Sequence, residues 1–163
     1  MNQNENKVYD KLKSLGINYE VHEHPPVLTV EDAQKYWSNI EGAQCKNLFL
    51  RNQKGKFHYL IIMEESKRVD MSKLASQIGE NKLSFASDQR LEKYLGLKTG
   101  AVSPFGLIND ENHVVEVKID KDLKKTKIIN FHPNVNTATI SISFKDFEKF
   151  LKEQTNDVEY INI

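Results

Sequence analysis

The stretch from residue 46 to residue 63 constrains the fold more than any other, because it reads as two strands joined by a turn. Residues 46–51 and 57–63 are rich in apolar side chains, and the intervening Asn-Gln-Lys-Gly-Lys segment is typical of a hairpin connection. The second run is apolar at successive positions, so both of its faces are expected to be buried. It is therefore predicted to be a central strand of a sheet.

Helical and strand patterns flank this hairpin on both sides. Helices are predicted from apolar spacing and from start and stop residues at 8–15, 29–37, 70–78 and 87–95 and from Ser143 onward. Strands are predicted at 18–22, 127–131 and 137–143, with a second hairpin formed by 107–108 and 114–119. Since hairpins outnumber helical crossovers, the pattern predicts an α+β fold with a mixed, largely antiparallel sheet and flanking helices.

Composition excludes several classes of protein. Lys and Arg number 23, as do Asp and Glu, and a formal net charge of zero argues against strong non-specific nucleic-acid binding but leaves room for a local basic face. The single cysteine, Cys45, excludes an intramolecular disulfide framework and a cysteine-rich zinc site. The apolar runs are too short to cross a bilayer, and residues 1–7 lack the apolar core of a signal peptide. A cytoplasmic protein with one domain, residues 1–163, is expected.

Lys46 is the first candidate for a functional residue. In a strand it shares a face with Leu48 and Leu50, because side chains two residues apart point the same way. An ammonium group that is partly buried among leucines usually meets an anion or a polar ligand group. The alternative is a lysine at the end of a strand whose ammonium group reaches water.

Two loops are further candidates. Residues 100–104, Gly-Ala-Val-Ser-Pro, lie between a predicted helix and a predicted strand, and glycine permits close approach of a ligand to the backbone. The alternative is an ordinary turn. His132 begins a polar loop after a strand, where it can act as a base, bond a substrate or lie on the surface without a role.

Two other sources of chemistry are weaker. His22 and His24 form an H-x-H pair that can join His132 in a metal site, but no acidic or cysteine motif accompanies them. Cys45 lacks the context of a nucleophile, and a lone cysteine in a strand is usually a small core residue. The sequence contains neither a phosphate-binding glycine loop nor a serine-nucleophile elbow.

Three motifs follow one another along the chain: Cys-Lys-Asn-Leu-Phe-Leu at 45–50, Gly-x-x-x-Pro at 100–104 and Asn-Phe-His-Pro-Asn at 130–134. Together they resemble the YbaK/ProX family of trans-editing aminoacyl-tRNA deacylases, which is related to the editing domain inserted into bacterial prolyl-tRNA synthetases. The resemblance extends from about residue 7 to residue 151. The first motif and the His-Pro-Pro-Val-Leu-Thr-Val-Glu segment at 24–31 are more similar to the ProX branch than to the YbaK branch.

The resemblance implies an enzyme that hydrolyses the ester of alanine mischarged on proline tRNA and spares prolyl-tRNA by size exclusion. A second sieve is needed because one methylene gives a binding pocket only about 10- to 200-fold discrimination. The alternatives are a cysteinyl-tRNA(Pro) deacylase, as in the YbaK branch, and a non-catalytic module that binds tRNA or an amino acid. Expected partners are proline tRNA and, transiently, prolyl-tRNA synthetase.

The resemblance also assigns roles to residues. Lys46 would contact the terminal nucleotide or the ester and would form the catalytic set with Gly100 and Pro104. The backbone of the loop from Gly100 to Pro104, with Ala101, Val102 and Ser103, would position the aminoacyl group. Asn47 and His132 would supply supporting polar contacts. The terminal ribose 2′-hydroxyl would assist the attacking water, so no cofactor or metal is expected. Val30, Trp37 and Ile40 are expected to wall the amino-acid pocket.

Overall fold

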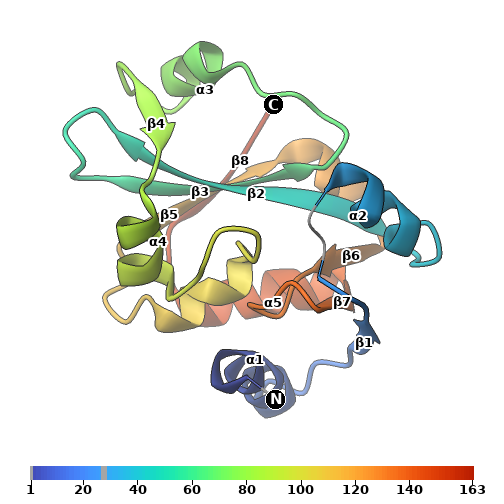
Figure 1. Ribbon diagram of the computed structural model, residues 1–163. Coiled ribbons are helices and arrows are strands. Elements are labelled where there is room, and N and C mark those ends of the chain that lie inside the picture. Colours follow the sequence, from blue (N-terminus) through green and yellow to red (C-terminus); the bar gives the residue numbers. More distant parts are fainter. Residues whose placement is uncertain (1, 27–28) are drawn as a thin grey trace.

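The computed structural model describes residues 2–26 and 29–163, so positions 27 and 28 of the 24–31 motif lie outside the described residues. The helices are α1 (Gln3–Ser14), α2 (Val30–Trp37), α3 (Met71–Gln77), α4 (Asp88–Leu95) and α5 (Phe144–Gln154), with the short 3-10 helices η1 (Pro104–Asn109) and η2 (Lys121–Lys125). The strands are β1 (Glu20–Glu23), β2 (Ala43–Asn52), β3 (His58–Glu64), β4 (Leu83–Phe85), β5 (Val115–Asp120), β6 (Ile128–Phe131), β7 (Ala138–Ser143) and β8 (Val158–Ile161), as Figure 1 shows.

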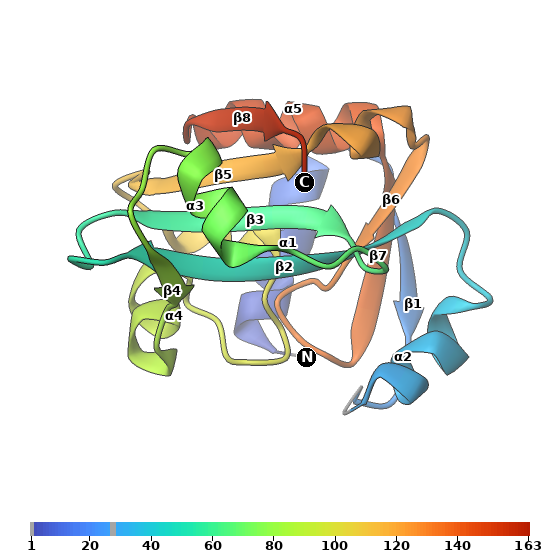
Figure 2. The ribbon, with the colours of Figure 1, turned by 90° about the horizontal axis from the view of Figure 1, so that it is seen from above.

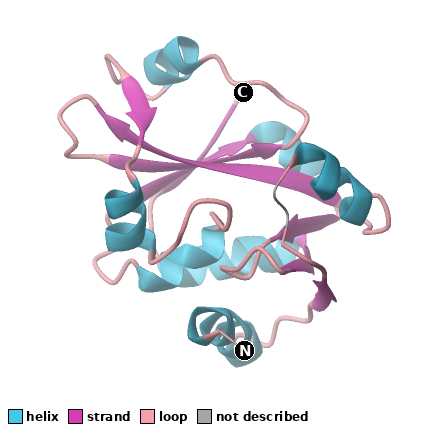
Figure 3. Ribbon diagram, viewed as in Figure 1, coloured by secondary structure: helices cyan, strands magenta, loops and turns pink. Residues whose placement is uncertain are grey.

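The strands form a mixed sheet in the order β1-β7-β6-β2-β3-β5-β8, with β4 attached to β2 (Figure 3). The pairs β2–β3, β2–β4, β6–β7 and β1–β7 are antiparallel. The pairs β2–β6, β3–β5 and β5–β8 are parallel. The predicted α+β class with a mixed sheet is confirmed, and so is the hairpin of β2 and β3.

The two edges of β2 are paired differently. Along one edge β3 pairs with β2 from Cys45 to Arg51. Along the other edge β6 pairs only with Ala43 and Gln44, and β4 pairs only with residues 50–52. Residues 45–49 therefore have a strand on one side only within the described part of the chain. We call this stretch the open edge of β2.

Helices cover the two faces of the sheet unequally. In Figures 1 and 2, α1 and α5 lie against one face, whereas α3 lies on the opposite face. The larger core cluster fills the first side and includes a group of phenylalanines in mutual edge or tilted contact: Phe105, Phe131, Phe147 and Phe150. The smaller cluster lies beneath α3 and includes Leu50, Ile61 and Met63. As predicted, β3 is buried on both faces, since six of its seven residues are buried.

Helices α2 and α5 begin where the capping signals predicted, whereas α1 begins at Gln3, five residues before the predicted 8–15 stretch. The Thr29 side chain accepts a hydrogen bond from the Asp32 N–H, and the Ser143 side chain accepts one from the Asp146 N–H, as N-cap residues do. Gly16, at φ +69°, follows the end of α1. The longest helix, α1, has 12 residues, and among the residues described none of the helices is long and apolar enough to span a membrane.

The predicted hairpin of residues 107–108 and 114–119 is wrong. Leu107 and Ile108 belong to the 3-10 helix η1, which Ser103 caps and Pro104 begins. Strand β5 instead pairs in parallel with β3, and Asp110 fixes its start because the carboxylate accepts a hydrogen bond from the Val115 N–H (2.9 Å). Leu107 is buried and Ile108 partly buried by helical packing, and neither pairs with a strand. The sequence reading also omitted β4 and β8, and the first strand lies at Glu20–Glu23 instead of 18–22.

Candidate active site

A cavity of about 490 Å³ lies at the open edge of β2. It brings together five of the residues predicted to act on the substrate: Lys46, Asn47, Gly100, Val102 and His132. Further lining residues are Trp37, Cys45, Leu48, Phe49, Phe85, Ala86, Asp88, Leu91 and Thr99. The cavity is thus built where segments remote in sequence, β2, β4, α4 and the loops after α4 and β6, come together.

The cavity reaches both faces of the sheet because side chains of β2 alternate. Lys46 lies opposite Met63, which belongs to the core cluster beneath α3. Asn47 lies opposite Ile62, which belongs to the larger cluster on the other face. A ligand that lies over the open edge can therefore touch Lys46 on one face and Asn47 on the other.

The open edge also presents backbone groups. The Phe49 carbonyl accepts a hydrogen bond from the Ala86 N–H (2.9 Å), so the peptide groups of odd-numbered residues in β2 point away from β3. The Gln44 carbonyl, by contrast, accepts from the Glu65 N–H just beyond β3 (2.8 Å). Since peptide groups alternate in direction along an antiparallel pair, the N–H and C=O of Asn47 point toward the open edge. They are suited to bond a substrate directly.

His132 is held as a neutral hydrogen-bond acceptor. Its Nδ1 lies 2.9 Å from the Ala138 carbonyl oxygen, to which it donates, so the other ring nitrogen, Nε2, carries a lone pair. Burial lowers the pKa of His132 and outweighs the Ala138 bond, which favours the charged form; His24 lowers the pKa further. The imidazole can accept a proton or hydrogen bond from a hydroxyl group or a water in the cavity.

Asn47 and Trp37 also offer polar atoms to a ligand. The Asn47 Oδ1 and the Trp37 Nε1 are buried, and neither has a hydrogen-bond partner within the described residues. Both side chains border the main cavity and a second, small cavity of about 10 Å³ beside His132, a space of about one water molecule. Buried polar atoms are nearly always bonded, so these two are expected to bond a substrate or a water.

The 100–104 loop divides into residues that line the cavity and residues that support it. Gly100 lines the cavity at φ +92°, a conformation that favours glycine, and Val102 lines it as well. Ala101, Ser103 and Pro104 are buried, and the Ser103 Oγ accepts a hydrogen bond from the Phe105 N–H (3.1 Å). Lys46 and Gly100 share the cavity, whereas Pro104 lies behind its wall as the first residue of η1.

Among the described residues that line the cavity, Lys46 is the only lysine or arginine. Among the described residues the lysines that form ion pairs are Lys67, Lys118 and Lys125, so Lys46 has no carboxylate ion-pair partner in that part of the chain. Cys45 also lines the cavity, but burial raises the pKa of its thiol, with Glu64 adding to the effect, and the thiol stays protonated. A protonated thiol is a poor nucleophile.

The three histidines proposed for a metal site have other partners. The His22 Nε2 lies 3.2 Å from the Ser141 Oγ, and the His24 Nε2 lies 2.9 Å from the Thr139 Oγ1. The His24 ring also stacks on Tyr36 and lies 6.2 Å, centroid to centroid, from His132. Across residues 2–26 and 29–163, no group of three His, Cys, Asp or Glu side chains is arranged to hold a metal ion.

Some lining residues were missed and some expected ones lie elsewhere. Trp37 lines the cavity as expected, Ile40 is not among the lining residues, and the placement of the Val30 side chain lies outside what the structure describes. Phe85 and Asp88 were missed because β4 was not predicted and because a phenylalanine or aspartate beside a helix start carries no distinctive signal. A larger hollow of about 730 Å³, between α5 and β8, contains none of the predicted site residues.

Comparisons with known proteins identify the family and the fold. Residues 24–150 match the model of the aminoacyl-tRNA editing domain. The chain is 46% identical over 158 residues to the prolyl-tRNA editing protein ProX of Acetoanaerobium sticklandii, covering 96% of this chain and 95% of that one. It is 32% identical to prolyl-tRNA synthetase associated domain-containing protein 1 of Bos taurus, covering 93% and 91% of the two chains. A crystal structure of a candidate trans-editing enzyme for prolyl tRNA synthetase shares the fold, with a TM-score of 0.74, 19% identity and coverage of 100% and 99%.

Proposed function

Because the chain belongs to the aminoacyl-tRNA editing domain family, we propose that it is a deacylase that edits mischarged proline tRNA in trans and that alanine is the amino acid it removes. The editing of mischarged proline tRNA follows from the identity to a prolyl-tRNA editing protein over nearly the whole chain. The observation that carries the proposal is the cavity at the open edge of β2, where Lys46, Asn47, Gly100 and His132 meet.

The proposed reaction is hydrolysis of the ester between the amino acid and the terminal ribose. The Lys46 ammonium group would lie near the phosphate or the ester. It would stabilise the negative charge that develops on the carbonyl oxygen of the ester during attack by water. The backbone at Gly100 and the peptide group of Asn47 would hold the aminoacyl group in place for attack. His132, neutral and with Nε2 as an acceptor, would bond a hydroxyl group of the substrate or the attacking water.

The ribose 2′-hydroxyl is proposed to assist the attacking water. Of the side chains that line the cavity, the Cys45 thiol stays protonated, and the Asp88 carboxylate already accepts a hydrogen bond from the Thr99 hydroxyl (2.7 Å). A substrate that ends in 2′-deoxyadenosine, with alanine on the 3′-oxygen, is expected to react about 10²- to 10⁴-fold more slowly in single-turnover assays. Cleavage of the deoxy substrate at the normal rate would transfer this role to a protein side chain, with His132 the first to be tested.

Alanine and proline would be separated by size. Trp37, Val102 and Phe49 line the cavity and can close it against the proline ring. Cysteine is close to alanine in size, so cysteinyl-tRNA(Pro) is the second candidate substrate, and the family membership itself does not distinguish the two. The proposed substrate also implies a cytoplasmic location, contact with proline tRNA and a transient contact with prolyl-tRNA synthetase. Residues 1–163 would act as one editing domain.

The decisive experiment is a deacylation panel with alanyl-, cysteinyl-, seryl- and prolyl-tRNA(Pro). The proposal expects fast loss of alanine and no loss of proline. Faster hydrolysis of the cysteinyl ester would assign the protein to cysteine instead. Binding of these tRNAs without hydrolysis would favour a non-catalytic module, and loss of activity with a chelator would favour a metal hydrolase.

A further inference from the structure

Phe85 is the most exposed large hydrophobic residue that lines the cavity. Its side chain is 62% exposed, although it ends a strand whose first residue, Leu83, is buried. Single exposed apolar side chains are common on protein surfaces and by themselves indicate nothing. The position of Phe85 in the lining of the same cavity as Lys46, a residue predicted to contact a nucleotide, is what requires an explanation.

Phe85 lies on the same face of the sheet as Lys46. It pairs directly with Leu50 across the antiparallel β2–β4 ladder, and directly opposed residues carry their side chains on one face. Along β2, Leu50, Leu48 and Lys46 alternate onto that same face. Leu48 packs on the cluster beneath α3, so an apolar strip runs from Lys46 across Leu48 to Phe85.

The other face of the open edge holds different chemistry. Asn47 lies there, and the cavity continues past it to His132, Gly100 and Val102. An aminoacyl ester and a 2′-hydroxyl group are small and polar and match that side. A nucleobase is flat and apolar on its two faces and matches the strip of Leu48 and Phe85, with the charge of Lys46 at one end.

From this arrangement, which rests on the proposed function, we propose that Phe85 is the stacking platform for the terminal adenine of the charged tRNA. The substrate would lie across the open edge of β2, with the base on the Lys46 face and the aminoacyl group on the Asn47 face. Because each base has an apolar π-face, an aromatic side chain can hold it without reading the sequence. Phe85 would thus position the ester without taking part in its hydrolysis.

Substitution of Phe85 tests the platform against a matched control. Phe57, which is 53% exposed and precedes β3, is absent from the residues that line the cavity. Loss of one base–aromatic stack is expected to lower kcat/KM for alanyl-tRNA(Pro) roughly 5- to 150-fold in Phe85→Leu, mainly through KM. Phe85→Trp should retain activity because it keeps an aromatic face, and Phe57→Leu should match the wild-type protein.

A substrate without the terminal base separates stacking from a structural role. Alanine attached to an abasic 3′-terminal ribose should lose the same factor with the wild-type protein, and Phe85→Leu should add little to that loss, since both changes remove one contact. If Phe85→Leu lowers the rate equally for the normal and the abasic substrate, the residue acts through the structure and the proposal is wrong. Wild-type kinetics in Phe85→Leu would also overturn it.

Binding gives a readout that does not depend on hydrolysis. The probe is an acceptor-stem RNA that ends in CCA with alanine attached through a stable amide, measured by fluorescence anisotropy. The dissociation constant should rise in Phe85→Leu by the same factor as KM and stay unchanged in Phe57→Leu. If the wild-type protein binds the probe but hydrolyses no member of the deacylation panel, the proposed function fails while the platform stands. If Phe85→Leu and Phe57→Leu bind the probe equally well, the proposed stacking role of Phe85 is wrong.

Discussion

At the scale of single residues, the site depends on the direction in which each side chain leaves one strand. Lys46 and Asn47 are neighbours in sequence, yet their partners in β3, Met63 and Ile62, belong to core clusters on opposite faces of the sheet. A shift of β2 by one residue would exchange them and would turn the ammonium group toward the larger core. The long register with β3, from Cys45 to Arg51, prevents this shift.

Replacement of Lys46 by alanine is expected to lower single-turnover deacylation roughly 10²- to 10³-fold, as for loss of a group that stabilises developing negative charge. The melting temperature should stay within about 2 °C, because the lysine has no ion-pair partner in the described chain and its removal opens no core cavity. Lys54→Ala, in the exposed turn between β2 and β3, is the control and should change neither value. A large loss of stability in Lys46→Ala would indicate a structural role.

His58 is expected to make stability depend on pH. It is 2% exposed, and burial, with Arg90 and Arg51 nearby, lowers its pKa to about 4. The unfolded chain therefore binds this proton at a higher pH than the folded one, near 6.5. The contribution of His58 to the free energy of unfolding is fully present above pH 6.5. It is lost as the pH drops toward 4, and the loss amounts to roughly 3 kcal/mol.

The measurement is urea unfolding between pH 4 and pH 7.5. His58→Gln keeps an acceptor for the Arg90 Nη1, which lies 3.0 Å from the His58 Nε2, and should reduce the dependence in this range, leaving the smaller part due to His132. His113→Asn is the control: His113 is exposed, and its φ of +53° suits asparagine. An unchanged slope in His58→Gln would contradict the assignment.

At the scale of elements, the 100–104 loop is fixed by the helix that follows it. The Ser103 Oγ caps η1, and Pro104 starts it with a φ that suits a helical turn. Because η1 packs against α4, whose last turn precedes the loop, both ends of the loop are held by one pair of helices. This explains how a segment that contains glycine can present a defined backbone to a ligand.

Ser103→Ala is expected to lower the free energy of unfolding by about 1 kcal/mol, the usual cost of losing an N-cap. Its effect on the rate of the chemical step should be less than about threefold, because Ser103 is buried behind the cavity wall. Ser103→Asp, in which a carboxylate can accept the same Phe105 N–H, tests whether the cap alone matters, although burial of its charge limits the recovery. A rate loss of 100-fold without loss of stability would assign Ser103 a direct role.

The sequence predicted the elements whose signals are local. Caps at Thr29 and Ser143 and the β2–β3 hairpin are encoded within a few residues and were found. The parallel pairing of β5 with β3 and β8 joins segments far apart in sequence, and an apolar pair such as Leu107–Ile108 cannot by itself distinguish a strand from a buried helical turn. Motifs singled out Lys46, Asn47, Gly100 and His132, which line one cavity, whereas the place of Phe85 in that cavity depends on a short strand that only tertiary pairing defines.

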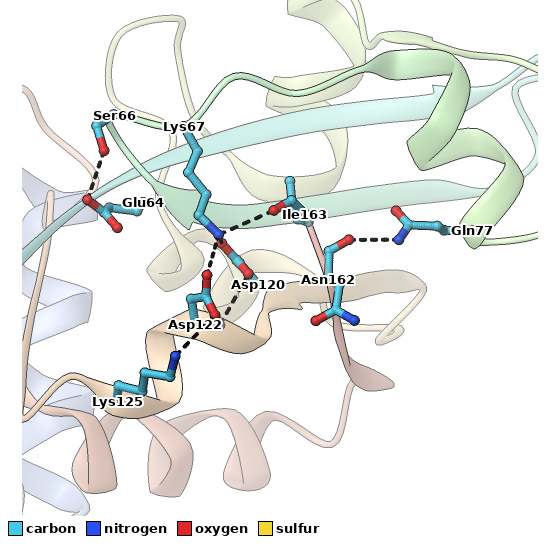
Figure 4. A network of polar contacts seen from close by, with 9 residues as sticks. All are labelled: Glu64, Ser66, Lys67, Gln77, Asp120, Asp122, Lys125, Asn162 and Ile163. Atoms are coloured by element: carbon cyan, nitrogen blue, oxygen red, sulfur yellow. Dashed lines mark hydrogen bonds and ion pairs between the residues drawn. The ribbon is translucent and has the colours of Figure 1, made fainter.

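At the scale of the whole molecule, one lysine joins the strand ends on the side away from the β2–β3 turn. Figure 4 shows the Lys67 ammonium group among Asp120, Asp122 and the carbonyl oxygen of Ile163. It lies 2.6 Å from a carboxylate oxygen of each aspartate. Asp120, which ends β5, is 1% exposed, so its charge depends on this contact. The hydrogen bonds to Asp120 and Asp122 raise the pKa of Lys67, and Lys67 lowers the pKa of Asp122.

Lys67→Met is expected to lower the free energy of unfolding by about 3 kcal/mol, because it leaves the Asp120 carboxylate buried without its partner. Lys125→Met is the control: that side chain is 84% exposed and pairs with Asp122 alone, so its loss should cost less than about 0.5 kcal/mol. Adding Asp120→Asn to Lys67→Met should recover part of the loss in thermal or urea unfolding. Equal stability of the two single variants would show that the network does not hold the strand ends together.

The open edge of β2 has a consequence for how the protein behaves in concentrated solution. Bare strand edges invite a strand from another molecule, and this pairing leads to aggregation. Here β6 and β4 close the edge at both ends and the Phe49 carbonyl already bonds the Ala86 N–H, so the bare stretch within the described chain is residues 45–48, shorter than a typical strand of five or six residues. The gap is long enough for the end of a nucleic-acid chain and too short for a foreign strand. The fold can therefore leave backbone groups free for its substrate without becoming a template for self-association.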